Sequence, residues 1–247
     1  MKRHSNWIFV ACGLLLSGAS AAPYNGLVLP VREVTISSLV EGRIESLAVR
    51  EGDRIEKGAP LVHLFAGMEE LEARRSAAAV EKREFEYKSS KNLFDEQVIS
   101  EDEAMESRIE LDLAKLTLEM AEERVAMRRL EAPITGIVVE RHFEEGEMVR
   151  PAEPILEVVD LTEVFVQFYV ESDRLSEVSV GQMASVMLPS LGRDLTFEGP
   201  VDFIDPRVDA ASGLSRVRVR LQNSDQVIKA GLRAKVDLIA MPETAGN

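Results

Sequence analysis

The most regular alternation of hydrophobic and polar positions lies between Met68 and Ala132. This span contains neither glycine nor proline, the two residues that most often interrupt a helix. Charged residues of both signs fill the positions between the apolar ones, and pairs such as Glu84/Lys88 stand at the i,i+4 spacing that stabilises a helix. The pattern therefore predicts helix throughout this span.

One interruption divides the span into two helices. Ser100 followed by Glu103 is a capping box, in which the serine oxygen accepts from the third helical amide and the glutamate reaches back. We predict one helix over about residues 67–97 and a second over about 101–131, joined by a tight turn. Together they form an antiparallel helical hairpin.

The second predicted helix carries two apolar rows, and one row is enough to pack a two-helix hairpin. The row with alternating steps of four and three is interpreted as the seam toward the first helix, whose own row is Ala73, Val80, Tyr87 and Phe94. The other row is predicted to mediate self-association through Leu111, Leu118 and Val125, although a merely wide apolar face would explain it as well. In full, the first row is Ile109, Leu113, Leu116, Met120, Met127 and Leu130, and the second is Leu111, Ala114, Leu118, Ala121 and Val125.

Two segments that flank the hairpin repeat the same landmarks at a separation of 94 positions. The matching pairs are Gly42 and Gly136, Gly52 and Gly146, and Pro60 and Pro154. Each copy reads as short strands joined by glycine turns, which need positive φ. We therefore predict that residues 38–64 and 132–159 fold together as one body.

The carboxyl-terminal third alternates apolar and polar residues with a period of two. Val164, Val166, Phe168 and Val170 form one such run, and turn-forming segments separate it from later runs. Several short strands with this spacing predict a small barrel or sandwich, to which residues 22–38 add one or two strands.

Composition and charge narrow the function classes. The 247 residues carry a formal net charge of −14, which argues against nucleic acid as a partner, because phosphate binding needs clustered positive charge. Residues 1–21 read as a secretory signal with cleavage after Ala21; an uncleaved anchor or lipid attachment at Cys12 are the alternatives. Cleavage would remove the two positive charges of Lys2 and Arg3, so the formal net charge would change from −14 to −16. It would also remove the only cysteine.

The duplicated half-motif resembles the two halves of a lipoyl- or biotinyl-type domain, but the junction HLFAGMEELEA has no modifiable lysine and leads into the hairpin instead. This combination is similar to the periplasmic adaptor, or membrane fusion protein, family of bacterial export pumps. The motifs that carry the resemblance are Val40-Glu41-Gly42 with Glu51-Gly52-Asp53, the segment LEAPITGIVV from Leu130, and in the barrel Tyr169-Val170-Glu171-Ser172-Asp173, Ile204-Asp205-Pro206-Arg207-Val208-Asp209 and Ala230-Gly231-Leu232.

The resemblance implies an α+β fold: a split lipoyl-like β-sandwich with an inserted antiparallel α-helical hairpin, plus a small β-barrel domain. The expected divisions are a signal peptide over 1–21, the sandwich halves over 31–66 and 132–159, the hairpin over 67–131, the barrel over 22–30 and 160–240, and a tail over 241–247. Flexible joints are expected near residues 38–41 and 158–162.

By the same resemblance, the chain would be a non-enzymatic adaptor without a cofactor, located in the periplasm and associated with the inner membrane. It would link an inner-membrane transporter of the resistance-nodulation-division type to an outer-membrane channel, as a trimer or hexamer. Many members continue into a membrane-proximal domain; with few residues printed after Leu238, contact with the transporter would fall to the barrel and residues 22–30.

The hairpin tip is the expected docking site for the outer-membrane duct. Family members carry Arg, Leu and Ser there at spacings of four and seven. Leu93 and Ser100 fit, whereas Ser89 stands at the arginine position, with Lys88 next to it. A structural explanation competes, because Ser100 is already a helix cap and Leu93 can pack near the turn.

Other candidate sites give weaker signals. Arg216, Arg218 and Arg220 alternate on one strand face, either as a solvated face or as an interface for an acidic partner. His63 and His142 occupy non-equivalent repeat positions and are predicted to be solvent-facing rather than metal ligands, because metal sites need three or four clustered ligands. No phosphate loop or nucleophile elbow is present.

Three rival functions remain open at this point. An adaptor for an ATP-driven exporter or a type I secretion system would more often carry an amino-terminal membrane helix and a longer hairpin. A lipoyl or biotinyl carrier domain would need the missing lysine. A purely structural coiled coil would leave the half-motifs and the barrel unexplained.

Overall fold

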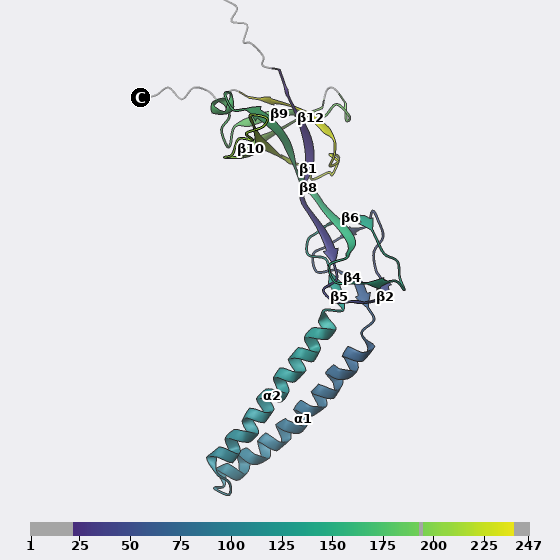
Figure 1. Ribbon diagram of the computed structural model, residues 1–247, viewed down its shortest axis with the longest axis vertical. Coiled ribbons are helices and arrows are strands. Elements are labelled where there is room, and N and C mark those ends of the chain that lie inside the picture. The colour runs from purple at the N-terminus through teal and green to yellow at the C-terminus, as the bar shows by residue number, and fades with distance from the viewer. Residues whose placement is uncertain (1–21, 193–194, 240–247) are drawn as a thin grey trace, which may run out of the picture. The chain divides into compact units, whose positions relative to one another are not determined.

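The computed structural model describes residues 22–192 and 195–239, which form two compact units. The first unit contains residues 22–27, 166–221 and 232–239, and the second contains residues 28–165 and 222–231. The predicted signal peptide, residues 1–21, and the tail, residues 241–247, lie outside the described residues. Two long strands, β1 (Tyr24–Ser37) and β8 (Pro154–Glu171), supply residues to both units (Figure 1). Residues 158–162, where the sequence predicts a joint, lie inside β8.

The second unit contains a sandwich built from both repeat copies. The first copy gives β2 (Gly42–Leu47), β3 (Arg54–Ile55) and β4 (Pro60–Leu64), and the second gives β6 (Gly136–Arg141), β7 (Met148–Val149) and the start of β8. The copies interlock, because β2 pairs with β7 and β3 pairs with β6. The single body predicted from the repeat is thereby confirmed.

The interlocking obeys an internal two-fold relation that matches the sequence offset. The Gly52 amide donates to the Val138 carbonyl, and the Gly146 amide donates to the Ile44 carbonyl, both at 2.8 Å. Within the copies, Ser46 pairs with His63 just as Glu140 pairs with Glu157, each immediately after a β-bulge. One continuous core fills the space between the copies, and its fully buried members include Ile44, Leu61, Val138 and Ile155.

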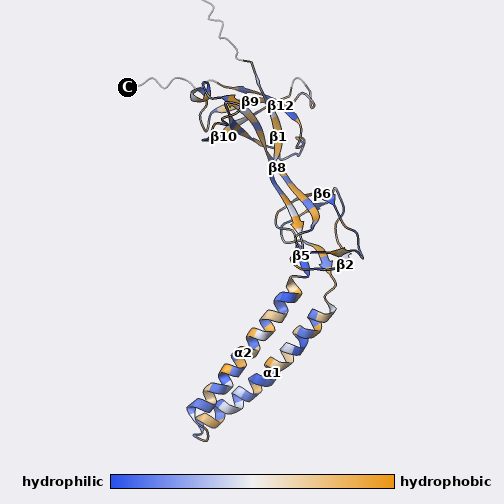
Figure 2. Ribbon diagram, viewed as in Figure 1, coloured by the Kyte–Doolittle hydropathy of each residue, from blue (hydrophilic) through white to orange (hydrophobic). Residues whose placement is uncertain are grey.

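Two antiparallel helices are inserted between the copies, side by side in Figure 1: α1 (Gly67–Asp95) and α2 (Glu101–Ala126). The predicted capping box is present, with the Ser100 side chain accepting from the Glu103 amide at 3.2 Å. Gln97, with φ of 62°, makes the tight turn. Figure 2 shows mostly hydrophilic helices with scattered apolar positions, whereas hydrophobic and hydrophilic positions are mixed along the strands.

The predicted end of the second helix at residue 131 is wrong. The helix stops at Ala126, and β5 (Arg129–Glu131) pairs with β4. Leu130 is only 9% exposed because it belongs to the sandwich core, so it continues the apolar spacing of the helix without being helical. The change from helix to sheet pairing occurs at Arg128, whose carbonyl accepts a hydrogen bond from the Leu64 amide at 2.8 Å.

The first unit is a small antiparallel β structure. It contains β9 (Met183–Met187), β10 (Thr196–Ile204), β11 (Leu214–Gln222), β12 (Arg233–Leu238) and the 3-10 helix η1 (Leu175–Glu177). β9 pairs with β10 and β12, β10 pairs with β11, and β12 pairs with the start of β1. Alternate side chains such as Val186, Val217 and Val236 are completely buried, as the period-two pattern predicts.

Candidate partner-binding surfaces

The hairpin tip presents apolar side chains beside the predicted docking residues. Leu93 is 40% exposed on the last turns of α1, one helical turn from Ser89. The Ser89 hydroxyl donates to the Phe85 carbonyl at 2.9 Å, and Lys88 is exposed. Sequence reasoning missed Val98, which is 64% exposed in the turn itself. The sequence feature that could have identified Val98 is an apolar residue at a turn, where no hydrophobic core is available to bury it.

The two apolar rows of α2 are buried in the opposite sense to the prediction. Leu111 is 5% exposed and Ala121 is 2% exposed, and Leu118 and Val125 on the same row are half-buried. This row lies against α1, where Ala73, Val80 and Tyr87 are also half-buried. The prediction that Leu111, Leu118 and Val125 form a free self-association seam is therefore wrong, because these side chains already pack within the hairpin.

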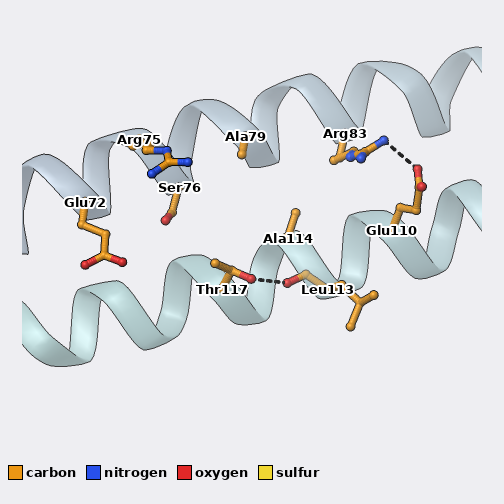
Figure 3. A pocket seen from close by; sticks show the side chains of 9 residues that line it. All are labelled: Glu72, Arg75, Ser76, Ala79, Arg83, Glu110, Leu113, Ala114 and Thr117. Carbon is orange, nitrogen blue, oxygen red and sulfur yellow. Dashed lines mark hydrogen bonds and ion pairs between the residues drawn. The ribbon is translucent and has the colours of Figure 1, made fainter.

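The row expected to face α1 is instead exposed. Figure 3 shows Leu113 directed away from α1, whereas Ala114 points toward it. Four of its members, Ile109, Leu113, Leu116 and Met120, are 52% to 61% exposed, and Met105, one turn before Ile109, is 48% exposed. The last two members differ, because Met127 is half-buried and Leu130 belongs to the sandwich core. A long helix face with this many uncovered apolar side chains is typical of a protein-binding surface.

Ion pairs cross between the helices at several levels. Arg83 on α1 binds Glu110 on α2 at 2.6 Å (Figure 3), and Arg124 on α2 binds Glu72 on α1 at 2.8 Å. Arg83 also binds Glu86 on its own helix at 2.7 Å. Hydrogen bonding to Arg83 lowers the pKa of Glu86. Arg83 and Glu110 line a groove of about 560 Å³ whose other lining residues include Ser76, Ala79 and Thr117. Exposed pairs contribute little stability each, so their main effect is to fix the register of the two helices.

Arg128 ties the root of the hairpin to the sandwich. Its guanidinium donates to the carbonyls of Glu41 at 3.0 Å and Phe65 at 3.3 Å, and it pairs with Glu69 on the first turn of α1. One side chain thus joins both helix ends to the bend after β1. Such a clamp restrains the arm relative to the sandwich in which it is rooted.

The arginine row on β11 is already paired within the barrel unit. Arg216 binds Asp205 at 3.0 Å, and Arg218 and Arg220 both bind Asp202. Bonds from Arg207 and then the nearby Arg216 charge lower the pKa of Asp205 to about 2. The row is therefore partly neutralised, and its role as an interface for an acidic partner stays a prediction.

Both histidines approach carboxylates in the sandwich. His63 Nδ1 lies 3.2 Å from Glu45, and the ring of His142 lies between Glu140 and Glu157. Within the described part of the chain, the latter three residues form the group whose ligand atoms could hold a metal ion. Single-residue reasoning missed this group because its members come from two strands.

Among residues 22–192 and 195–239, no helix is both long and apolar enough to cross a membrane.

Two family models match most of the chain. The model of a CzcB-like, barrel-sandwich hybrid domain matches residues 32–160, and the model of a CusB-like, beta-barrel domain matches residues 163–242. The first covers the split sandwich with its hairpin, and the second covers most of the barrel strands.

Curated relatives are longer than this chain. The cobalt-zinc-cadmium resistance protein CzcB of Cupriavidus metallidurans is 25% identical over 213 residues, covering 80% of this chain and 40% of that protein. The nodulation protein NolF of Rhizobium meliloti is 25% identical over 228 residues, covering 86% of this chain and 62% of that protein. The chain thus spans about half the length of these relatives.

Solved structures share the fold at low identity. A MacA–MexA chimeric protein with the Pseudomonas aeruginosa MexA α-hairpin domain aligns with a TM-score of 0.80 and 18% identity, covering 88% of this chain and 80% of that one. The membrane fusion protein Spr0693 of Streptococcus pneumoniae aligns with a TM-score of 0.74 and 15% identity, covering 90% and 100%.

Proposed function

Because this chain belongs to the membrane fusion protein family of efflux adaptors, we propose that it links an inner-membrane transporter of the resistance-nodulation-division type to an outer-membrane channel in a tripartite pump. It works in the periplasm, attached to the inner-membrane side, and performs no catalysis of its own. The transporter selects and drives the cargo, and the adaptor seals and couples the conduit.

The observation that carries this proposal is the way the hairpin is rooted. Both helices emerge from one interlocked sandwich, and Arg128 joins their bases to Glu41, Phe65 and Glu69. A two-helix arm held at its root by a packed core can transmit a displacement along its length. A carrier domain would instead present a short tip with a modifiable lysine.

The arm tip is the proposed contact with the outer-membrane channel. Leu93 and Val98 expose apolar area there, and Lys88 and Ser89 lie on the adjoining turns of α1. A photo-crosslinking residue at position 93 should capture the channel protein in intact cells. The same residue at Glu84, in the middle of α1, is the control; capture from Glu84 alone would contradict tip docking.

The exposed row of α2 is the proposed self-association surface of a trimer or hexamer. This row replaces the row of Leu111, Leu118 and Val125, which packs inside the hairpin, as the candidate surface for self-association. Disulfide capture with Leu116→Cys should give a disulfide-linked dimer, because Leu116 is 55% exposed, whereas Leu111→Cys at a 5% exposed position should not. Both variants are made with Cys12 replaced by Ser. Equal capture from both positions would argue against this surface.

A further inference from the structure

We propose that Glu140, His142 and Glu157 form a binding site for a divalent transition-metal ion on the outer face of the sandwich, a role that goes beyond the adaptor function and does not depend on it. Glu140 is the second-last residue of β6, His142 directly follows that strand, and Glu157 lies on the neighbouring β8. One ligand atom from each lies within 4.8 Å of the others.

A β-bulge brings the three side chains together. The register of β6 against β8 shifts between Val138 and Glu140, which places Glu140 directly opposite Glu157. The His142 amide then bonds the Ile155 carbonyl at 3.0 Å, and this keeps His142 on the same face, two residues after Glu140. The backbone therefore fixes the spacing of the ligands, and the side chains need only small adjustments.

With a neutral imidazole, the group carries two negative charges and no positive one. Two carboxylates directly opposite each other on paired strands destabilise a sheet. Among the residues that the structure describes, the cationic side chain within ion-pairing distance of either carboxylate is His142 itself. Its Nδ1 lies 3.6 Å from Glu140 and its Nε2 lies 3.4 Å from Glu157, but a neutral imidazole has only one N–H to donate. The other nitrogen then directs its lone pair at a carboxylate, and a bound cation would remove that repulsion.

The spacing suits a tetrahedral ion. Zinc bonds of the usual length hold neighbouring ligand atoms about 3.3 Å apart. The 3.4 Å between Nε2 and Glu157 already has this value, and the Glu140 side chain, 57% exposed, is free to rotate inward. One nitrogen and two oxygen ligands favour zinc or cobalt(II) over copper(I), which prefers sulfur. The solvent-facing fourth position would be filled by water.

The other half of the sandwich shows that the fold does not need this group. By the 94-residue offset, Ser46, Ala48 and His63 stand where Glu140, His142 and Glu157 stand in the second copy. The equivalent backbone bond, from the Ala48 amide to the Leu61 carbonyl at 2.9 Å, is kept. Thus the same backbone in the first copy places only one ligand-type residue, His63, at these three positions, and the second copy places three.

The test is calorimetric titration of the full chain, purified without a histidine tag, with zinc alone as the probe. His142→Ala and Glu140→Ser copy the residues of the first half, so they preserve folding, which circular dichroism checks. We expect zinc binding to the wild type, at least a tenfold loss of affinity in either variant, and no change in the matched control Glu45→Gln/His63→Gln. The proposal is overturned if zinc does not bind, if His142→Ala binds as tightly as the wild type, or if the control loses the same affinity.

Cobalt(II) absorption provides a second measurement that does not rely on affinity. Binding by one imidazole and two carboxylates should give visible bands of a low-coordinate cobalt ion in the wild type and none from this site in Glu157→Gln. Bands that persist unchanged in Glu157→Gln would place the ion elsewhere and contradict the site.

Discussion

At the scale of single residues, the repeat supplies matched positions with different surroundings. A Cβ on Gly136 would lie 2.5 Å from the Val159 carbonyl oxygen, which belongs to a strand backbone and cannot retreat. A Cβ on the equivalent Gly42 would instead meet the end of the Arg128 side chain at 2.7 Å. The same substitution therefore has different costs in the two halves.

We expect Gly136→Ala to destabilise the sandwich by about 1–3 kcal/mol, because the β6–β8 pairing must shift. Gly42→Ala should cost less, since a guanidinium can move. Thermal unfolding followed by circular dichroism compares the two. A larger loss for Gly42→Ala would contradict the pairing described for β6 and β8.

Asp205 gives the barrel unit a pH dependence on the acid side. Its pKa falls from an ordinary 3.8 to about 2, first through the bond from the Arg207 side chain. A lowered pKa contributes stability that is present above the unfolded value and is lost as pH falls through the folded value, here between about pH 4 and pH 2. The unfolding temperatures of wild type and Asp205→Asn should therefore converge over this window. A difference that stays constant down to pH 2 would contradict the assignment.

At the scale of elements, the helix cap and the docking role of Ser100 can be separated. Ser100→Ala removes the oxygen that caps α2 and should cost about 1 kcal/mol of helix stability. Ser100→Asn keeps a capping oxygen but removes the hydroxyl, so the stability should be retained. Unfolding experiments measure the stability that the cap contributes, and crosslinking from position 93 measures docking onto the channel. If Ser100→Asn docks normally while Ser100→Ala does not, Ser100 acts as a cap alone.

The exchange of the two α2 rows predicts opposite effects for neighbouring leucines. Leu111→Ala should destabilise the hairpin by about 2 kcal/mol or more, because Leu111 is packed against α1. Leu113→Ala, at a 58% exposed position, should change stability by less than about 0.5 kcal/mol. Loss of the helical circular dichroism signal on heating reports both. If Leu113→Ala destabilised the hairpin more than Leu111→Ala, the row that contains Leu113 would face α1, as the sequence pattern predicts.

The sequence predicted the elements better than their facing surfaces. The absence of glycine and proline and the capping box located both helices, but two rows with the same spacing cannot reveal which of them meets the partner helix. The sequence feature that distinguishes the rows is side-chain size: the covered row of α2 contains Ala114 and Ala121, α1 contains the covered Ala73 and Ser76, and small residues allow close packing. The end of α2 was missed because Leu130 keeps the helical spacing while its backbone pairs in a sheet.

At the scale of the whole molecule, the repeat offset predicted which segments fold together, because equivalent glycines and prolines mark equivalent turns. It could not predict the bulge that aligns Glu140 with Glu157, since a bulge depends on the pairing of two distant strands. The family and the α+β architecture followed from motifs in order along the chain. The identities of the partner proteins rest on the proposed function alone.

The most direct test of that function is affinity purification of the chain from solubilised membranes, with the bound proteins identified by mass spectrometry. The account predicts that one inner-membrane transporter of the resistance-nodulation-division type and one outer-membrane channel are recovered together, and that substitution of Leu93 by Asp reduces the channel without reducing the transporter. Recovery of a folded chain with neither partner, or with an ATP-driven exporter instead, would contradict it.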